Sequence, residues 1–142
     1  MIDRCVNERY NKYVDTKKQV LIITDGTELI EHIAKSITSA FKDCTVKVCS
    51  GVTFAGTDLL KAKIFFIGCE NPDPVSFNYL SKLLGHINLA NRHCGVFSTN
   101  DKALKYLCGL LKDCEAKIEE PLLVQAGNID SDVLNKYLGK FI

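Results

Sequence analysis

The chain has 142 residues, a length typical of a single domain. Leu, Ile, Val and Phe supply 45 of those residues, enough apolar side chains to form a packed core. The formal charge is only +1, from 18 Lys and Arg against 17 Asp and Glu, which disfavours binding to nucleic acid or to an anionic membrane. The longest apolar runs, 20–23 and 64–67, are far shorter than the roughly 20 residues of a membrane span, and residues 1–18 lack a signal-peptide core. We therefore expect a soluble, cytoplasmic protein.

The cysteine and histidine residues form no recognisable metal or disulfide pattern. The chain has seven cysteines, an odd number, and no C-x-x-C pair, which fits neither a zinc site nor a disulfide scaffold. His32, His86 and His93 are scattered along the sequence. We expect no metal site, and most cysteines are expected to be small buried side chains in a reducing compartment.

Residues 1–16 form an extension before the main domain, which we place at 17–142. Their apolar residues lie at roughly helical spacing, which predicts a short helix. Such a helix could dock on the domain or on a second copy, forming a homodimer, and an unstructured tail fits the same residues equally well.

In the domain, strand-like and helix-like segments alternate. Apolar runs predict strands at 19–23, 45–49, 63–68 and 93–98, and a fifth at 116–125 that is interrupted near Pro121. Apolar stripes predict helices from the turn at 24–28 to about 42, and at 76–87, 102–112 and 130–141, with a helical turn near 58–61. Asp25 is the expected N-cap of the first helix, with Glu28 completing a capping box, and Asp130 or Ser131 caps the last.

This alternation requires right-handed crossovers and a parallel sheet covered on both faces. We predict an α/β fold, a three-layer sandwich whose five-stranded parallel sheet has the order 2-1-3-4-5, with its switch point between the first and third strands. A binding site would then lie in the loops after strands one, three and four. The candidate cofactor-binding residues in these loops are Thr24, Asp25, Gly26, Thr27, Cys69, Glu70, Asn71, Ser98, Thr99 and Asn100.

From about residue 17 to its end, the chain resembles flavodoxins. The run 20–23 with Thr27-Glu28 is similar to the family's first strand and T-G-N-T-E loop. Residues 88–92 and 96–98 are similar to its D-L-x-G-K and A-x-F-G-S series, and 138–140 to its terminal helix. The resemblance implies the flavodoxin fold and, for an ordinary member, an electron carrier that binds FMN.

The phosphate-binding loop departs from the family pattern. In flavodoxins the FMN phosphate rests on a hydroxyl-rich loop, S-x-T-G-x-T, and on a helix N-terminus. Here only Thr24, Asp25 and Gly26 stand between Ile23 and Thr27, about three residues short of that loop. A carboxylate about 6 Å from a phosphate charge costs roughly 3 kcal/mol at an effective dielectric of 20, more than the roughly 1 kcal/mol that a helix dipole contributes. We expect repulsion to prevail.

The loops that would hold the flavin ring also depart. Flavodoxins place aromatic rings after the third and fourth strands, and stacking on them tunes the flavin. This chain has no Trp, and no aromatic residue lies within 69–76 or 98–104, while Tyr106 falls on the next helix. The loop 99–101 is too short to cover a flavin, and the nearly neutral charge differs from the acidity of electron-carrying flavodoxins.

Other chemistries find little support in the sequence. Cys69 opens into the predicted crevice, but neighbouring Glu70 would raise its thiol pKa, so we expect no thiol chemistry. A phosphoacceptor receiver domain would need an Asp after strand three and a Lys after strand five, where Cys69 or Glu70 and Gln125 stand. No nucleophile lies with a histidine in the crevice, so we expect no enzyme.

The sequence therefore predicts a flavodoxin-like domain that has lost ordinary FMN binding and needs no cofactor. We expect it to act by interaction with a protein partner of unknown identity or with a small ligand. The alternative is a short-chain flavodoxin that carries electrons on weakly bound FMN.

Overall fold

The computed structural model describes residues 18–125 and 129–141, so the predicted N-terminal helix at 1–16 lies outside the described residues. Its sheet has the strand order β3-β2-β4-β5-β6, with β7 also paired to β5, and every pairing is parallel. The strands are β2 (Gln19–Thr24), β3 (Thr45–Ser50), β4 (Ile64–Gly68), β5 (His93–Ser98), β6 (Lys117–Ile118) and β7 (Leu122–Leu123). Since β6 and β7 are the two parts of the interrupted fifth strand, the predicted order 2-1-3-4-5 is confirmed.

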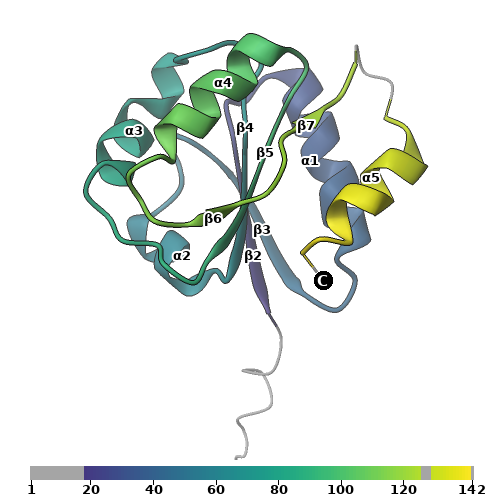
Figure 1. Ribbon diagram of the computed structural model, residues 1–142, viewed down its shortest axis with the longest axis horizontal. Helices are drawn as coiled ribbons and strands as arrows, with labels where there is room; N and C mark the ends of the chain where they lie inside the picture. The colour runs from purple at the N-terminus through teal and green to yellow at the C-terminus, as the bar shows by residue number, and fades with distance from the viewer. Residues whose placement is uncertain (1–17, 126–128, 142) are drawn as a thin grey trace, which may run out of the picture.

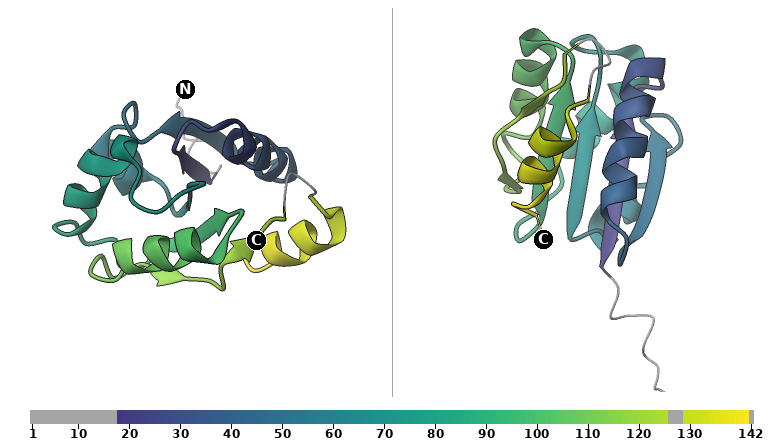
Figure 2. Two further views of the ribbon diagram at one scale, coloured as in Figure 1. Left: turned by 90° about the horizontal axis from the view of Figure 1, so that it is seen from above. Right: turned by 90° about the vertical axis from the view of Figure 1, so that its right-hand side faces the viewer.

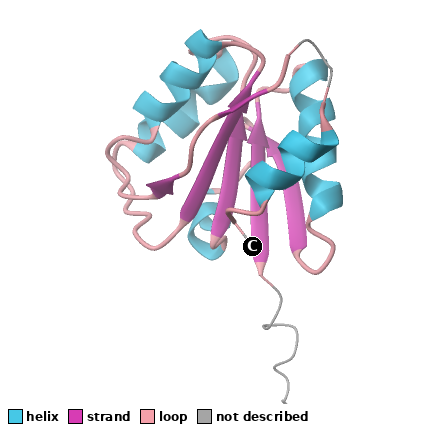
Figure 3. Cartoon of the chain, turned by 45° about the vertical axis from the view of Figure 1, so that its right-hand side comes forward, coloured by secondary structure: helices cyan, strands magenta, loops and turns pink. Residues whose placement is uncertain are grey.

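Helices cover both faces of this sheet, as Figures 1 and 3 show. On one face lie α1 (Glu28–Ala40) and α5 (Ser131–Leu138). On the other lie α2 (Gly56–Lys61), α3 (Asn78–Leu84) and α4 (Asp101–Leu110), with a 3₁₀ turn, η2 (Val75–Phe77), leading into α3. The three-layer α/β sandwich expected from the sequence is therefore present.

The core divides between the two faces because successive strand side chains point to opposite sides. Phe65 and Ile67 of β4 pack with α2, α3 and α4, whereas Phe66 packs with α1 and α5. The Phe66 ring lies 5.8 Å from that of Phe41 and 4.8 Å from that of Phe141, measured between centroids. All five residues of β4 are buried, as expected of a central parallel strand.

Several element boundaries differ from the sequence expectation. The helix α1 begins at Glu28 with Thr27 as its N-cap, so the prediction that Asp25 caps it is wrong. Asp130 does cap α5, since its side chain accepts a hydrogen bond from the Asp132 N–H. The helix α3 is shorter than predicted because its first turn is the 3₁₀ segment η2 and it ends before Gly85.

The described residues include six cysteines, all of them free thiols, and Cys69, Cys94 and Cys114 are buried. Within 18–125 and 129–141, no three His, Cys, Asp or Glu side chains are arranged to hold a metal ion. No helix in the same ranges is long and apolar enough to cross a membrane.

Candidate functional site

Three loops meet at the edge of the sheet where β2, β4 and β5 end. The register pairs Thr24 with Gly68 and Gly68 with Phe97, so the loops 24–27, 69–75 and 98–101 leave neighbouring strands at the same level. The left panel of Figure 2 looks onto this end of the molecule. The three predicted site loops therefore lie together, as expected at a topological switch point.

The Asp25 carboxylate joins the first two of these loops. Its Oδ1 accepts hydrogen bonds from the Thr27 N–H at 3.0 Å and the Thr27 hydroxyl at 2.7 Å. Its Oδ2 accepts the Glu70 N–H, 45 residues further along the chain, at 2.8 Å. This bridge explains the failed capping prediction, because Asp25 is occupied with the β4 loop and the Thr27 hydroxyl is directed back to Asp25 instead of capping α1. An internal carboxylate thus occupies two backbone donors of the loops.

Thr24 is also engaged within the protein. It has no exposed surface, and its hydroxyl donates to the Glu31 carboxylate on α1 and accepts the Gly26 N–H at 3.3 Å. Gly26 has φ of +85°, a left-handed conformation that glycine adopts without the steric penalty of a Cβ. The turn is therefore a tight, internally bonded structure of the β2–α1 connection.

The third loop is tied to the second in the same way. The Ser98 hydroxyl, fully buried, donates to the Cys69 carbonyl at 2.6 Å. The Asn100 side chain donates to the Glu70 carbonyl at 2.6 Å and accepts the Ala103 N–H at 2.9 Å, which caps α4. The side-chain N–H and the side-chain oxygen of Asn100 therefore both have partners within the protein.

The Cys69 thiol is enclosed. The residue has no exposed surface, and burial, followed by the nearby Asp25 carboxylate, raises the pKa of the thiol to about 12. The carboxylate responsible is Asp25 instead of Glu70, on which the sequence expectation rested. A thiol with this pKa is protonated at neutral pH.

The other candidate residues differ in exposure. Asn71 and Gly26 are exposed, while Thr27, Glu70 and Thr99 are half-buried. Most of the candidates therefore lie at one edge of the sheet with their polar groups committed to each other. Within the described part of the chain, four of the candidates have side chains that make no hydrogen bond: Cys69, Glu70, Asn71 and Thr99.

Tyr106 is a site residue that sequence reasoning set aside on the helix α4. Its hydroxyl is buried and has no hydrogen-bond partner among the described residues. Burial, then the carboxylate of Asp73 and the thiol of Cys69, raises the pKa of this phenol to about 12. The sequence feature that could have identified Tyr106 is its position in the second turn of a helix that begins at a site loop.

Charge is distributed unevenly around this end of the sheet. The loops that follow β2, β4, β5 and β7, with the first turns of the helices after them, form what we call the acidic rim. Among the described residues it holds eight carboxylates and one ammonium group: Asp25, Glu28, Glu31, Glu70, Asp73, Asp101, Asp130, Asp132 and Lys102. None of these carboxylates forms an ion pair with another described residue.

Two surface cavities lie on the flanks of the domain. One, of about 720 Å³, is lined by α1 and α5 residues that include His32, Ser36 and Asn135. The other, of about 430 Å³, lies beside α4 and is lined by Leu104, Cys108 and other residues. The first lies to the side of the place where the three site loops meet, and the second reaches Asp101 at the end of the third loop.

The arrangement defines the class first: it is a doubly wound α/β protein with a parallel sheet and a topological switch point between β2 and β4. No protein-family model matches the sequence, and no curated protein matches it significantly.

Solved structures then specify the fold. A short-chain flavodoxin associated with a PDU bacterial microcompartment is 18% identical, with a TM-score of 0.66 over 87% of this chain and 94% of that one. The flavodoxin of Streptococcus pneumonia TIGR4 is 17% identical, with a TM-score of 0.67 over 87% and 99% of the two chains. A Fusobacterium nucleatum flavodoxin bound to flavin mononucleotide is 11% identical, with a TM-score of 0.63 over 88% and 94%. The chain has a flavodoxin-like fold.

The fold raises the question whether the residues present suit FMN. A phosphate at a loop of this kind needs free N–H donors at the helix N-terminus. Here the Thr27 and Glu70 N–H groups are bonded to Asp25, whose negative charge stands within the loop. No Phe, Tyr, Trp or His occurs in 69–76 or 98–104 to stack on a flavin. These residues do not fit the cofactor.

Proposed function

We propose that this protein is a cofactor-free, non-enzymatic domain that uses the flavodoxin fold for protein interaction. The observation that carries the proposal is the Asp25 carboxylate, which accepts the Thr27 and Glu70 N–H groups at 3.0 and 2.8 Å. A bound phosphate would have to displace this internal anion and then tolerate its charge nearby. The enclosed side chains of Thr24 and Ser98 support the same conclusion, since both hydroxyls are used within the protein.

The acidic rim supports a positively charged partner over an anionic ligand. Unpaired carboxylates on one end of a small domain repel anions and attract cationic surfaces over roughly a Debye length, about 8 Å at physiological salt. Complementary charge of this kind mainly raises association rates and rejects wrong partners. We therefore expect the partner to present basic side chains to this end of the sheet.

An FMN titration tests the proposal. Purified protein should be colourless and should leave flavin fluorescence unchanged at high micromolar FMN. The variant Asp25→Ser, which frees two N–H donors and removes one charge, should bind FMN or inorganic phosphate more tightly than the native protein. The matched control is Asp101→Ser, which removes a carboxylate from the same rim without touching the Asp25 bridge, and it should leave the titration unchanged.

The alternative, an electron carrier on weakly bound FMN, predicts different results. Yellow protein with quenched flavin fluorescence would support that carrier and contradict our proposal. Weaker FMN binding by Asp25→Ser than by the native chain would also contradict our account of the loop.

A further inference from the structure

An exposed apolar patch borders the acidic rim. Val52 is 74% exposed, Val75 83% and Tyr79 53%, which are high values for apolar side chains. Val52 belongs to the loop between β3 and α2, whereas Val75 and Tyr79 belong to η2 and α3. Single exposed valines are common on protein surfaces, but a contiguous group on adjoining segments is typical of an interaction site.

The two segments of the patch are packed against each other. A Cβ at Gly51 would collide with the carbonyl oxygen of Ser76 and the ring of Phe77, so the backbones are in direct contact next to Val52 and Val75. The Phe54 and Tyr79 rings lie 5.3 Å apart between centroids, and Phe54 and Phe77 are buried beneath. The patch is therefore held in one shape by the core, so a partner would not have to order it.

Negative charge lies on the side of the patch that faces the site loops. The Ser76 hydroxyl donates to the Asp25 carbonyl at 3.5 Å, which joins the patch to the first loop of the rim. Glu70 and Asp73 precede Val75 in the same loop, and Asp73 is exposed. Lys82, one turn after Tyr79, is the nearby cation on α3.

We propose that the patch of Val52, Val75 and Tyr79 is the docking site for a basic, amphipathic segment of a partner protein, whose apolar side chains cover the patch while its Lys or Arg side chains face the acidic rim. The inference rests on the proposed function and names the partner's chemistry. Charge complementarity selects this occupant, because the carboxylates beside the patch repel an acidic segment and attract a basic one.

The test is an NMR titration of the full chain, labelled with ¹⁵N. The probe is a Leu/Lys amphipathic peptide of about 14 residues, long enough for nearly four helical turns. Two further peptides of equal length, one of Leu and Glu and one of Gly and Lys, separate the apolar contribution from the charge. All three titrations are made at about 0.5 M salt, where the Debye length is about 4 Å. The Leu/Lys peptide should shift the amide resonances of 51–54 and 75–79, and the other two peptides should leave them unchanged.

Paired variants locate the contact. The double variant Val52→Ser and Val75→Ser should weaken binding of the Leu/Lys peptide about tenfold, since two largely exposed valines lose their apolar contact. Both side chains are exposed, so the variant should fold normally. The control is Val133→Ser on α5, which is 52% exposed on another part of the surface and should bind the peptide unchanged.

Three outcomes would overturn the inference. The first is equal binding of the Leu/Lys and Gly/Lys peptides, which would show that charge alone explains the binding. The second is that the Leu/Lys peptide leaves the amide resonances of 51–54 and 75–79 unshifted. The third is a concentration-dependent shift of those resonances without peptide, with dimers in sedimentation, which would make a second copy the occupant. If FMN shifts the amide resonances of 24–27 and the flavin fluorescence is quenched, the proposed function fails. Absence of both FMN and peptide binding overturns the docking site alone.

Discussion

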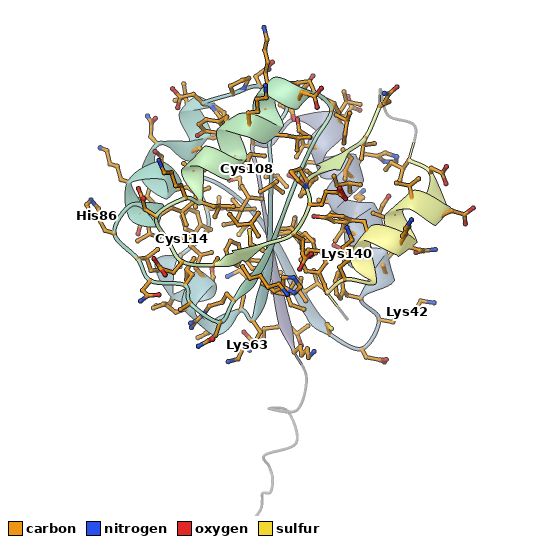
Figure 4. All side chains as sticks on the ribbon, viewed as in Figure 1. Lys42, Lys63, His86, Cys108, Cys114 and Lys140 are labelled. Atoms are coloured by element: carbon orange, nitrogen blue, oxygen red, sulfur yellow. The ribbon has the colours of Figure 1, made fainter. Side chains whose placement is uncertain are left out.

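The two ends of the sheet carry net charges of opposite sign. Where the strands end, the acidic rim gathers eight carboxylates and one lysine, and none of those carboxylates is paired with another described residue. Where the strands begin, the turns and the last turns of the helices among the described residues carry ten Lys or Arg against five Asp or Glu: Lys18, Lys42, Lys61, Lys63, Lys82, Arg92, Lys112, Lys117, Lys136, Lys140, Asp43, Asp113, Glu115, Glu119 and Glu120. Figure 4 shows Lys42 and Lys63 extending outward from this end.

Four of the charged side chains at the strand-start end form ion pairs, in contrast to those of the rim. Glu119 contacts both His93 and Lys117, and Lys140 lies 3.4 Å from Glu120. The His93 ring stacks against Phe141 with centroids 4.4 Å apart. A formal charge of +1 therefore conceals a strongly polarised molecule, whose negative end holds the hydrogen-bonded loops.

The two ends of the sheet are held by different kinds of contact. At the loop end, hydrogen bonds run between loops and satisfy the Glu70 N–H and the backbone carbonyls of Cys69 and Glu70. At the strand-start end, ion pairs join the sheet to neighbouring segments at the surface. Substitutions at each end should therefore differ in size and in pH dependence.

The largest effect is expected for Gly51→Ala. Its Cβ would meet the Ser76 backbone, which cannot move without shifting η2, so the variant should lose about 3 kcal/mol of unfolding free energy. The matched control is Gly56→Ala, whose Cβ would lie 3.5 Å from the Leu83 side chain, an ordinary contact. As Gly56 is the first residue of α2, the control should be neutral or slightly stabilising. Urea denaturation of both variants measures the difference, and equal stabilities would show that the two segments are not in rigid contact.

A smaller loss is expected for Asp25→Ala. The change leaves the Thr27 and Glu70 N–H groups without their carboxylate partner, which should cost about 2 kcal/mol. Glu28→Ala removes an exposed carboxylate from the same rim and should change the unfolding free energy by no more than about 0.5 kcal/mol. Hydrogen exchange of the Glu70 amide should accelerate in the first variant alone. An unchanged exchange rate would contradict the bridge.

The smallest effect is expected at the other end, for Glu119→Gln. The hydrogen bond with His93 lowers the pKa of the Glu119 carboxyl in the folded protein. A lowered folded-state pKa adds stability above the unfolded pKa of about 4.3, and this contribution is lost as pH falls through the folded-state pKa.

The Glu119 and His93 side chains are half-buried, and we expect the variant to lose about 1 kcal/mol or less at pH near 6 and a smaller amount at pH near 3. Glu120→Gln is the control, since Glu120 is 76% exposed and its contact to Lys140 spans 3.4 Å. Denaturation curves at both pH values measure the difference. A loss that is undiminished at the acid pH would show that the Glu119 contribution is packing instead of charge.

Most of the fold could be predicted from local pattern. The run 64–68 is apolar at every position and could only be a strand buried on both faces, as β4 is. Pro121 interrupts the last strand where predicted, because proline cannot donate to a ladder, and β6 and β7 stand on either side of it. Helix ends were less predictable, as η2 and the early end of α3 show, since packing against the 51–54 loop competes with helical propensity.

The candidate site was predicted in location but not in its bonding. The sequence placed Asp25 in the turn after the first strand, where it departs from the flavodoxin loop pattern. Asp25 was predicted to cap the first helix, because capping is a contact between near neighbours. The acceptor role toward Glu70 depends on two loops that meet only when β2 and β4 pair. Likewise, the neutral composition hid the acidic rim, which exists because parallel strands bring every following loop to one edge.

The amino-acid order by itself determined the alternation of strands and helices, the buried central strand and the three loops of the crevice, because apolar periodicity acts over a few residues at a time. Only the tertiary structure decided that Asp25 bridges to Glu70, that Thr24 and Ser98 are enclosed, and that Val52, Val75 and Tyr79 share one surface. These facts depend on contacts between residues distant in the chain, and such contacts are set by the packing of the whole sheet.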